Sequence, residues 1–325
     1  MKNKILIILF LLCSSSTFAC DICGCFMGIT PYDNVSSFGI FYRYRSYNGY
    51  FGQDQQFFPS GSSFFPIQDQ TNNSPGNHNG LLGDYEVYRT TELRGRYFLQ
   101  KRLEINAIIP YLNNTEKYNN QTSTISGLGD MTFYAGYHLI RKLDQKKMNQ
   151  RLILGAGIKL PTANNRIKSD QGFTYSNPFQ PGTGSTDGFV YANYIIGIKN
   201  WGASINSTYK FNGQNADQES IANSTTSFLS IFRKIDLGKN VKIIPSVQTS
   251  YEFTKGEKYQ GKLTGEHETN NLMAGAGLDI FVKNIGINTS FQTNAWSAQT
   301  DHPRSSGRLT LGITYNLKQL YYAIN

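Results

Sequence analysis

The sequence has few apolar residues, and after the run Ile5–Leu12 it has no long apolar segment. Hydrophobic residues make up 39% of the 325 positions, and the mean hydropathy is −0.39. A membrane-spanning helix needs roughly 20 consecutive apolar residues, so the sequence excludes such helices after its first segment. A soluble core of this size would normally use more Leu and Val. Any insertion into a membrane must therefore use strands, whose backbone groups can all be paired in a closed sheet.

The first residues have the pattern of a secretory signal peptide. Lys2 and Lys4 give a positive start, and Ile5–Leu12 is apolar but too short to cross a bilayer as a helix. Thr17-Phe-Ala19 is an acceptable cleavage site. We therefore predict that residues 1–19 are removed and that the mature chain is exported.

Cysteine is scarce, with four in the chain, and one of these, Cys13, lies in the signal. The others, Cys20, Cys23 and Cys25, open the mature chain within a segment that we place at residues 20–37. Their spacing is not that of haem attachment or of a zinc ribbon. Three readings stay open: a disulfide or idle thiols in an oxidising compartment, a site for a soft metal such as Cu(I), or lipidation of Cys20.

Acidic residues are fewer than basic ones, 22 against 31, which gives a formal net charge of +9. A nucleic-acid-binding protein would gather its basic residues on one element, whereas here they spread over the whole chain. We therefore expect no nucleic-acid partner. The charge fits a solvated, mildly basic interior and rim, or alternatively a preference for anionic solutes or lipid headgroups.

Aromatic residues and glycine are abundant, with 21 Tyr, 21 Phe and 31 Gly, and apolar residues alternate with polar or small ones. The segment 151–160 alternates in this way, a long polar loop follows over 161–187, and 190–198 alternates again. Period-two alternation indicates strands with unlike surroundings on their two faces. Strands of about ten residues around a long loop are typical of an outer-membrane barrel hairpin.

Three short motifs carry a resemblance to a known family. They are Gly127-Leu-Gly-Asp-Met-Thr132, Gly157-Ile-Lys-Leu-Pro-Thr162 and Gln180-Pro-Gly-Thr-Gly-Ser185. With these motifs the chain resembles the outer-membrane barrel family labelled as a MetA-pathway phenol-degradation protein, over most of its length after Asp84. The resemblance implies a barrel, and a transported solute that is hydrophobic or aromatic.

The pattern predicts an all-β, antiparallel, up-and-down transmembrane barrel of about twelve strands over residues 38–317, followed by a tail over 318–325. The expected strands are 38–47, 86–99, 103–111, 128–140, 151–160, 190–198, 203–211, 224–234, 241–253, 271–282, 285–296 and 308–317. Their connections alternate between long and short, as in bacterial barrels with short periplasmic turns and long external loops.

We therefore place the chain in the outer membrane of a Gram-negative bacterium, with both termini in the periplasm. The expected partners are outer-membrane lipid, a small-molecule solute and the barrel assembly machinery, which would read the closing strand. Tyr and Trp near the strand ends fit the aromatic girdles of such barrels. The candidate girdle residues are Tyr111, Tyr137, Trp201, Tyr209, Tyr251, Trp296 and Tyr315.

Strand parity places a set of charged side chains inside the predicted barrel, where they could set selectivity or fill the lumen as a salt-bridged plug. These expected lumen-lining residues are Arg43, Arg45, Glu92, Arg94, Arg96, Asp130, His138, Lys159, Lys210, Glu252, Asp279 and Arg308.

The leading hypothesis for function is passage of a small solute, gated by the external loops 50–84 and 161–187. No catalytic motif is present, and no spacing of Ser, His and Asp nominates a triad, so we do not expect an enzyme. Two alternatives are a copper-handling protein that uses the cysteine segment and an outer-membrane lipid hydrolase. The hydrolase would need a Ser–His pair on the membrane-facing surface.

Overall fold

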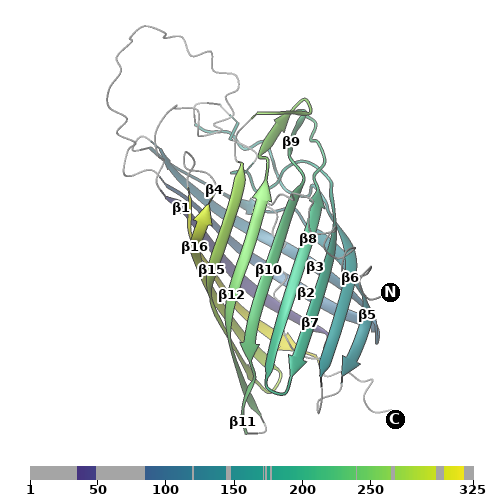
Figure 1. Cartoon of the computed structure of the whole chain (residues 1–325). Coiled ribbons are helices and arrows are strands. Elements are labelled where there is room, and N and C mark those ends of the chain that lie inside the picture. Colours follow the sequence, from purple (N-terminus) through teal and green to yellow (C-terminus); the bar gives the residue numbers. More distant parts are fainter. Residues whose placement is uncertain are drawn as a thin grey trace, which may run out of the picture.

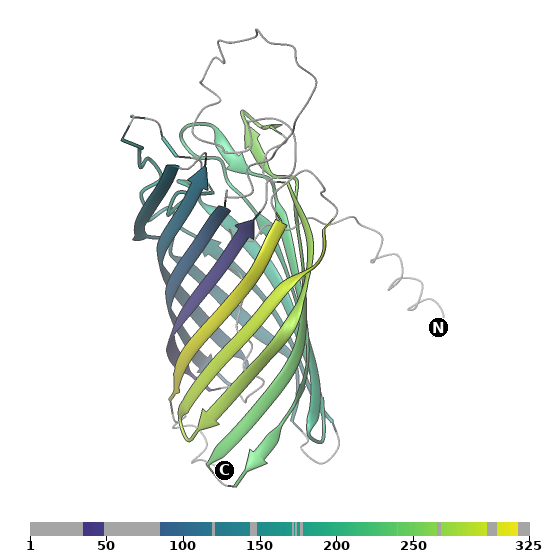
Figure 2. The same ribbon diagram turned by 90° about the vertical axis from the view of Figure 1, so that its left-hand side faces the viewer.

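The computed structural model describes residues 35–48, 85–118, 121–143, 148–170, 172, 174–175, 178–238, 240–264, 268–297 and 304–317. Twelve long strands form a closed antiparallel barrel, tilted against its axis (Figures 1 and 2). They are β1 (Ser37–Asn48), β2 (Tyr85–Gln100), β3 (Leu103–Tyr118), β5 (Thr132–Leu143), β6 (Asn149–Lys159), β7 (Asp187–Ile198), β8 (Trp201–Phe211), β10 (Ser224–Arg233), β12 (Val241–Thr254), β15 (Thr269–Val282), β16 (Ile285–Ser297) and β17 (Arg304–Asn316).

Each of these strands pairs with its neighbours in chain order, and the first pairs with the last, which closes the sheet. In β1 and β17, Ile40 lies opposite Ile313 and Arg45 lies opposite Arg308. A closed sheet leaves no unpaired edge, which is the condition for strands to cross a lipid bilayer. The predicted twelve-stranded antiparallel barrel is confirmed. Within the described residues, no helix is long and apolar enough to span a membrane.

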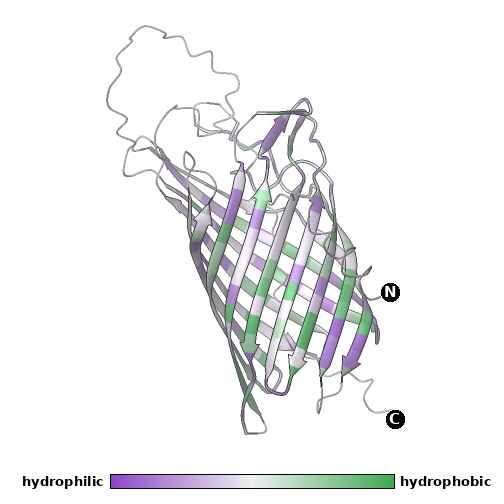
Figure 3. Ribbon diagram, viewed as in Figure 1, coloured by the Kyte–Doolittle hydropathy of each residue, from purple (hydrophilic) through white to green (hydrophobic). Residues whose placement is uncertain are grey.

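Apolar and polar residues alternate along the strands (Figure 3), and the two faces of the strands differ in exposure accordingly. On β1, Ile40 is 59% exposed, whereas its neighbour Phe41 is 7% exposed. Large apolar side chains such as Leu93, Val190 and Ile313 are likewise exposed on the outer face. An outer face of this composition fits contact with lipid tails. Among the exposed aromatics are the expected girdle residues Tyr111, Tyr137, Trp201, Trp296 and Tyr315.

The connections at one end of the barrel are much longer than those at the other, and we call these the long-loop end and the short-turn end. At the long-loop end, β9 (Glu219–Ile221), β13 (Glu257–Tyr259) and β14 (Lys262–Leu263) form a separate small sheet (Figure 1). At the short-turn end, β11 (Ile235–Leu237) extends the β10–β12 connection. At both ends of the barrel, connections that were expected to be irregular thus contain short strands.

The prediction of a loop over residues 112–127 is wrong. The Asn- and Thr-rich segment up to Gly127 is instead a hairpin, in which β3 runs on to Tyr118 and pairs with β4 (Gln121–Leu128). Both faces of this hairpin are rich in polar residues, so it carries no apolar alternation from which a strand could be predicted. The chain then leaves the sheet at 129–131, where Gly129 N donates to Pro110 O at 2.8 Å, and re-enters it with β5.

Apolar side chains also pack inside the barrel. Ile195, Phe232, Ile244 and Phe281 form one buried cluster near the short-turn end, drawn from β7, β10, β12 and β15. A second cluster joins Ile153, Phe189 and Tyr191, with Tyr134 packed against it. The inner face is therefore not uniformly polar, and apolar side chains fill part of the barrel interior.

Several predicted regions lie outside the described residues. They are the signal peptide 1–19, almost all of the segment 20–37 with Cys20, Cys23 and Cys25, the loop 50–84, and the tail 318–325. Within the part of the chain that is described, no group of three or more His, Cys, Asp or Glu side chains is arranged to hold a metal ion.

Candidate functional site

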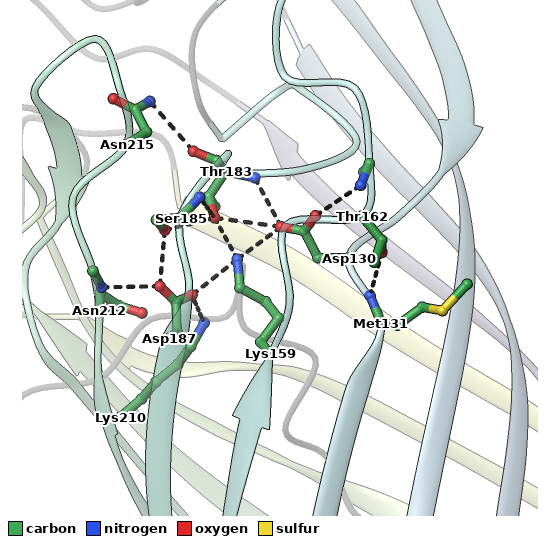
Figure 4. Close-up of polar contacts among 12 residues, drawn as sticks. Asp130, Met131, Lys159, Thr162, Thr183, Ser185, Asp187, Lys210, Asn212 and Asn215 are labelled. Atoms are coloured by element: carbon green, nitrogen blue, oxygen red, sulfur yellow. Dashed lines mark hydrogen bonds and ion pairs between the residues drawn. The ribbon is translucent and has the colours of Figure 1, made fainter.

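Asp130 occupies the break between β4 and β5, and there its carboxylate holds a long loop (Figure 4). Its Oδ2 accepts hydrogen bonds from Lys159 Nζ at 2.8 Å and from the backbone N of Thr183 at 3.0 Å. Its Oδ1 accepts from the backbone N of Ala163 at 3.1 Å. Ala163 and Thr183 belong to the β6–β7 loop, residues 160–186, so one buried carboxylate ties both limbs of this loop to the wall.

Asp187, at the start of β7, extends the same network (Figure 4). Its Oδ2 lies 2.9 Å from Lys159 Nζ and 2.9 Å from Lys210 Nζ, while its Oδ1 accepts from Ser185 Oγ at 2.8 Å. All these side chains are buried. Buried charges are tolerated when they are paired and hydrogen-bonded, and here two carboxylates balance two ammonium groups.

The part of the β6–β7 loop that approaches β7 is buried as well, over residues 178–182. Phe179 is 2% exposed, and its carbonyl oxygen accepts a hydrogen bond from Asn114 Nδ2 of β3 at 2.9 Å. The side chain of Gln180 braces the loop internally, because its Nε2 donates to Ile167 O at 2.9 Å and to Tyr175 O at 3.0 Å. This part of the loop is thus packed into the barrel mouth.

Two glycines let this loop reach the carboxylate. A Cβ on Gly182 would lie 2.6 Å from Asp130 Oδ1 and 2.6 Å from the Cβ of Ala163, so a side chain has no room there. Gly184 has φ +68°, in the left-handed region that favours glycine. The spacing Gly-Thr-Gly therefore presents Thr183 N to Asp130.

The three motifs behind the family resemblance meet at this point. Besides the contacts of Asp130, Thr162 Oγ1 accepts from Met131 N at 2.9 Å and donates to Gly129 O at 3.2 Å. The segments 127–132, 157–162 and 180–185 thus form one hydrogen-bonded unit at the long-loop end. We call this unit the loop anchor.

A second set of charged side chains lies on the barrel wall around β1, and we call it the arginine wall. It comprises two arginine–glutamate–arginine groups. In the first, Arg43 Nη2 lies 2.6 Å from Glu92 Oε1, and Arg94 Nε donates to Glu92 Oε2 at 2.6 Å. The guanidinium of Arg94 also stacks over the Phe41 ring, 4.3 Å from its centroid.

In the second group, Glu252 of β12 contacts Arg45 of β1 and Arg308 of β17. Arg45 Nη2 lies 2.9 Å from Glu252 Oε2, and Arg308 Nη2 pairs with Oε1. In the sheet, β17, β16 and β15 separate β1 from β12. The Arg45–Glu252 ion pair therefore crosses the inside of the barrel instead of running along the wall.

The other expected lumen residues lie apart from both groups. His138 Nε2 lies 3.2 Å from Glu104 Oε2, and its ring packs 5.5 Å from that of Phe98. Arg96 lies over the same Phe98 ring at 5.8 Å. Asp279 accepts from Asn288 Nδ2 at 2.7 Å, away from the anchor and the arginine wall.

Sequence reasoning missed several residues of these groups. Asp187 was assigned to the end of a loop, although it has the same parity as Phe189 and Tyr191, which are buried inside. Glu104 likewise has the parity opposite to Leu103 and Ile105, so alternation could have nominated it as the partner of His138. No sequence signal points to Asn114, because its segment was read as a loop.

A closed antiparallel barrel with an apolar outer face and charged groups paired inside defines the class of the protein: it is a β-barrel of the outer-membrane type. The family model described as "Putative MetA-pathway of phenol degradation" matches residues 66–311, and the chain belongs to this family. No curated protein matches the sequence.

The fold is shared with a solved structure at low identity. The COG4313 outer membrane channel from Pseudomonas putida F1 superimposes with a TM-score of 0.60 at 13% identity, covering 87% of this chain and 96% of that one. The β domain of the Bordetella autotransporter BrkA gives a TM-score of 0.47 at 12% identity, covering 88% of this chain and all (100%) of that one.

Proposed function

We propose that this protein is a channel for a small solute in the bacterial outer membrane, and that the β6–β7 loop is its gate. The observation that carries the proposal is the loop anchor. It holds residues 160–186 in the barrel mouth through polar contacts centred on Asp130, and polar contacts of this kind can be exchanged for water when the loop moves. The fold shared with the COG4313 outer membrane channel supports the same reading.

The orientation forms part of the proposal. The long-loop end faces the outside of the cell, and both chain ends lie on the periplasmic side, as in other single-chain bacterial barrels. A solute would then meet the β6–β7 loop first, pass the arginine wall, and leave through the cluster of Ile195, Phe232, Ile244 and Phe281 near the short-turn end.

The solute class is a small molecule with an aromatic or apolar body. Two apolar clusters line its path: Ile195, Phe232, Ile244 and Phe281 in one, and Ile153, Phe189 and Tyr191 in the other. An aromatic body can replace the contacts that these side chains make with one another, whereas a sugar would lose hydrogen bonds to water there. Proteoliposomes should therefore swell faster in phenylalanine than in a hexose of similar mass.

A disulfide that locks the loop tests the gate. A Cβ on Gly127 would lie 3.7 Å from the Cβ of Pro181, a separation that suits a disulfide. The double variant Gly127→Cys/Pro181→Cys, made with Cys20, Cys23 and Cys25 replaced by Ser, should lose conductance in planar bilayers on oxidation. It should regain conductance on reduction, whereas the single variant Gly127→Cys should respond to neither treatment.

Two results would contradict the proposal. Absence of conductance and of solute uptake by the wild-type protein would refute the channel. Unchanged conductance with the disulfide formed would refute the β6–β7 loop as the gate. Within the described residues the lipid-hydrolase alternative gains no support, because the one histidine among them, His138, is 1% exposed inside the barrel beside Glu104, away from the lipid-facing surface.

A further inference from the structure

The arginine wall holds more positive than negative charge in its first group. Glu92 is 1% exposed between Arg43 and Arg94, whose side chains are 16% and 11% exposed. One carboxylate thus faces two guanidinium groups, and the group carries a net charge of about +1, since an arginine side chain stays protonated in proteins. The loop anchor, in contrast, pairs Asp130 and Asp187 with Lys159 and Lys210, and so is balanced.

Uncompensated charge inside a barrel is costly, and an anion at that place would lower the cost. Arg43 has donors left for such an anion, because its Nε has no hydrogen-bond partner within the described part of the chain. Glu92 holds both guanidinium groups in position through ion pairs. The Phe41 ring also holds Arg94, because the guanidinium group stacks on it. The donors are therefore arranged before a ligand arrives.

We infer that Arg43 and Arg94 form a binding site for the carboxylate of the transported solute, with Glu92 as the positioning residue. A carboxylate is planar and takes two parallel hydrogen bonds from a guanidinium group, and its single charge matches the excess at this site. Phe41, two residues before Arg43 on the same face, is 7% exposed beneath the Arg94 guanidinium, so an aromatic body would lie against the apolar clusters inside the barrel. The inference rests on the proposed channel and names its substrate class as aromatic or apolar carboxylates.

Charge selectivity in planar bilayers tests the inference, with benzoate as the probe. In a tenfold gradient of potassium benzoate at pH 8, the reversal potential gives the permeability ratio of benzoate to potassium. We expect a ratio above one for the wild-type protein. Loss of charge-assisted hydrogen bonds in the variant Arg43→Gln/Glu92→Gln/Arg94→Gln should lower the ratio by about tenfold or more.

The control is Arg233→Gln, which also removes one net positive charge. Arg233 is exposed on the outer face, stacked over the Trp201 ring at 5.6 Å, so its loss should leave the ratio unchanged. Folding of the triple variant is checked by its heat-dependent gel mobility. If it does not fold, Arg43→Lys/Arg94→Lys keeps the charge and loses the fork geometry, and should lower the ratio by a smaller factor.

The experiment distinguishes failure of the carboxylate site from failure of the proposed channel. A wild-type ratio of one or less, or a ratio that the triple variant leaves unchanged, would overturn the carboxylate site and leave the channel standing. A wild-type protein that carries no current with any salt would overturn the proposed function and this inference together.

Discussion

At the scale of single residues, the protein depends on carboxylates that have several partners each. Asp130 accepts hydrogen bonds from a lysine and from two backbone N–H groups, and Glu252 contacts two arginines from other strands. Removal of such a carboxylate leaves buried donors without acceptors. This lowers the free energy of unfolding more than removal of an exposed ion pair does.

Asp130→Asn should loosen the β6–β7 loop. Loss of the charge-assisted hydrogen bonds should lower the free energy of unfolding by about 1.5–3 kcal/mol and raise the conductance. The midpoint of the heat-induced gel shift and single-channel recording measure the two effects. Asp217→Asn is the control, because Asp217 pairs with Arg166 on the surface, where both side chains are about half exposed, and its loss should cost about 0–1 kcal/mol. Equal midpoints for the two variants would contradict the role of Asp130.

Gly182→Ala tests whether the close approach of the loop matters. The added methyl would press on Asp130 and Ala163, and such overpacking typically costs about 1–3 kcal/mol. A Cβ on Gly188 would meet nothing within 4 Å, so Gly188→Ala is the matched control. We expect a lower heat-shift midpoint and a higher conductance for Gly182→Ala alone. The same midpoint in both variants would show that the loop does not need a glycine there.

At the scale of elements, the break between β4 and β5 has the largest consequence. Without it, β4 and β5 would be one strand with no place for a carboxylate that points at the loop. The small sheet of β9, β13 and β14 further joins two other long connections at the same end, with Ala222 N donating to Gly256 O at 2.7 Å. The long-loop end is therefore an organised layer over the barrel.

Short epitope tags at the two ends test the proposed orientation. A tag after Gly261, in the turn between β13 and β14, should be reached by antibody on intact cells. A tag between Lys283 and Asn284, in the turn between β15 and β16, should be reached once the outer membrane is permeabilised. The opposite pattern would invert the orientation, and with it the side from which the β6–β7 loop is met.

At the scale of the whole molecule, closure of the sheet makes the fold cooperative. Each of the twelve strands pairs on both sides, so no strand can leave without breaking two ladders. Contacts such as Arg45–Glu252 also join strands that are not neighbours in the sheet. The barrel should therefore resist detergent until it is heated.

Gel mobility tests this closure directly. Unboiled protein in dodecyl sulfate should migrate as a compact species, and boiling should shift it to the mobility expected for its mass. Identical migration with and without boiling would contradict a closed barrel. The variant Glu252→Gln should make the shift at a lower temperature, because it removes the charge between Arg45 and Arg308.

The strands could be predicted because their signal is local. Alternation such as that of Arg151, Ile153 and Gly155 against Leu152 and Leu154 can be read from a few neighbouring residues. The polar hairpin of β3 and β4 could not be read in this way, since both of its faces are rich in polar residues. The alternation along each strand could place Arg45 and Glu252 on an inner face, but it could not show that the two side chains contact each other.

The sequence by itself thus determined the strand count, the inner and outer faces, and the family, because each follows from short-range periodicity or short motifs. Only the tertiary structure decided which inner groups meet. Arg45 and Glu252 are 207 residues apart. Three motifs, up to 58 residues apart (127 to 185), converge on Asp130 because β5 pairs with β6 and the β6–β7 loop folds back onto them. Closure of a barrel brings side chains of distant strands into contact, and a pattern in neighbouring residues contains no information about which distant strands these are.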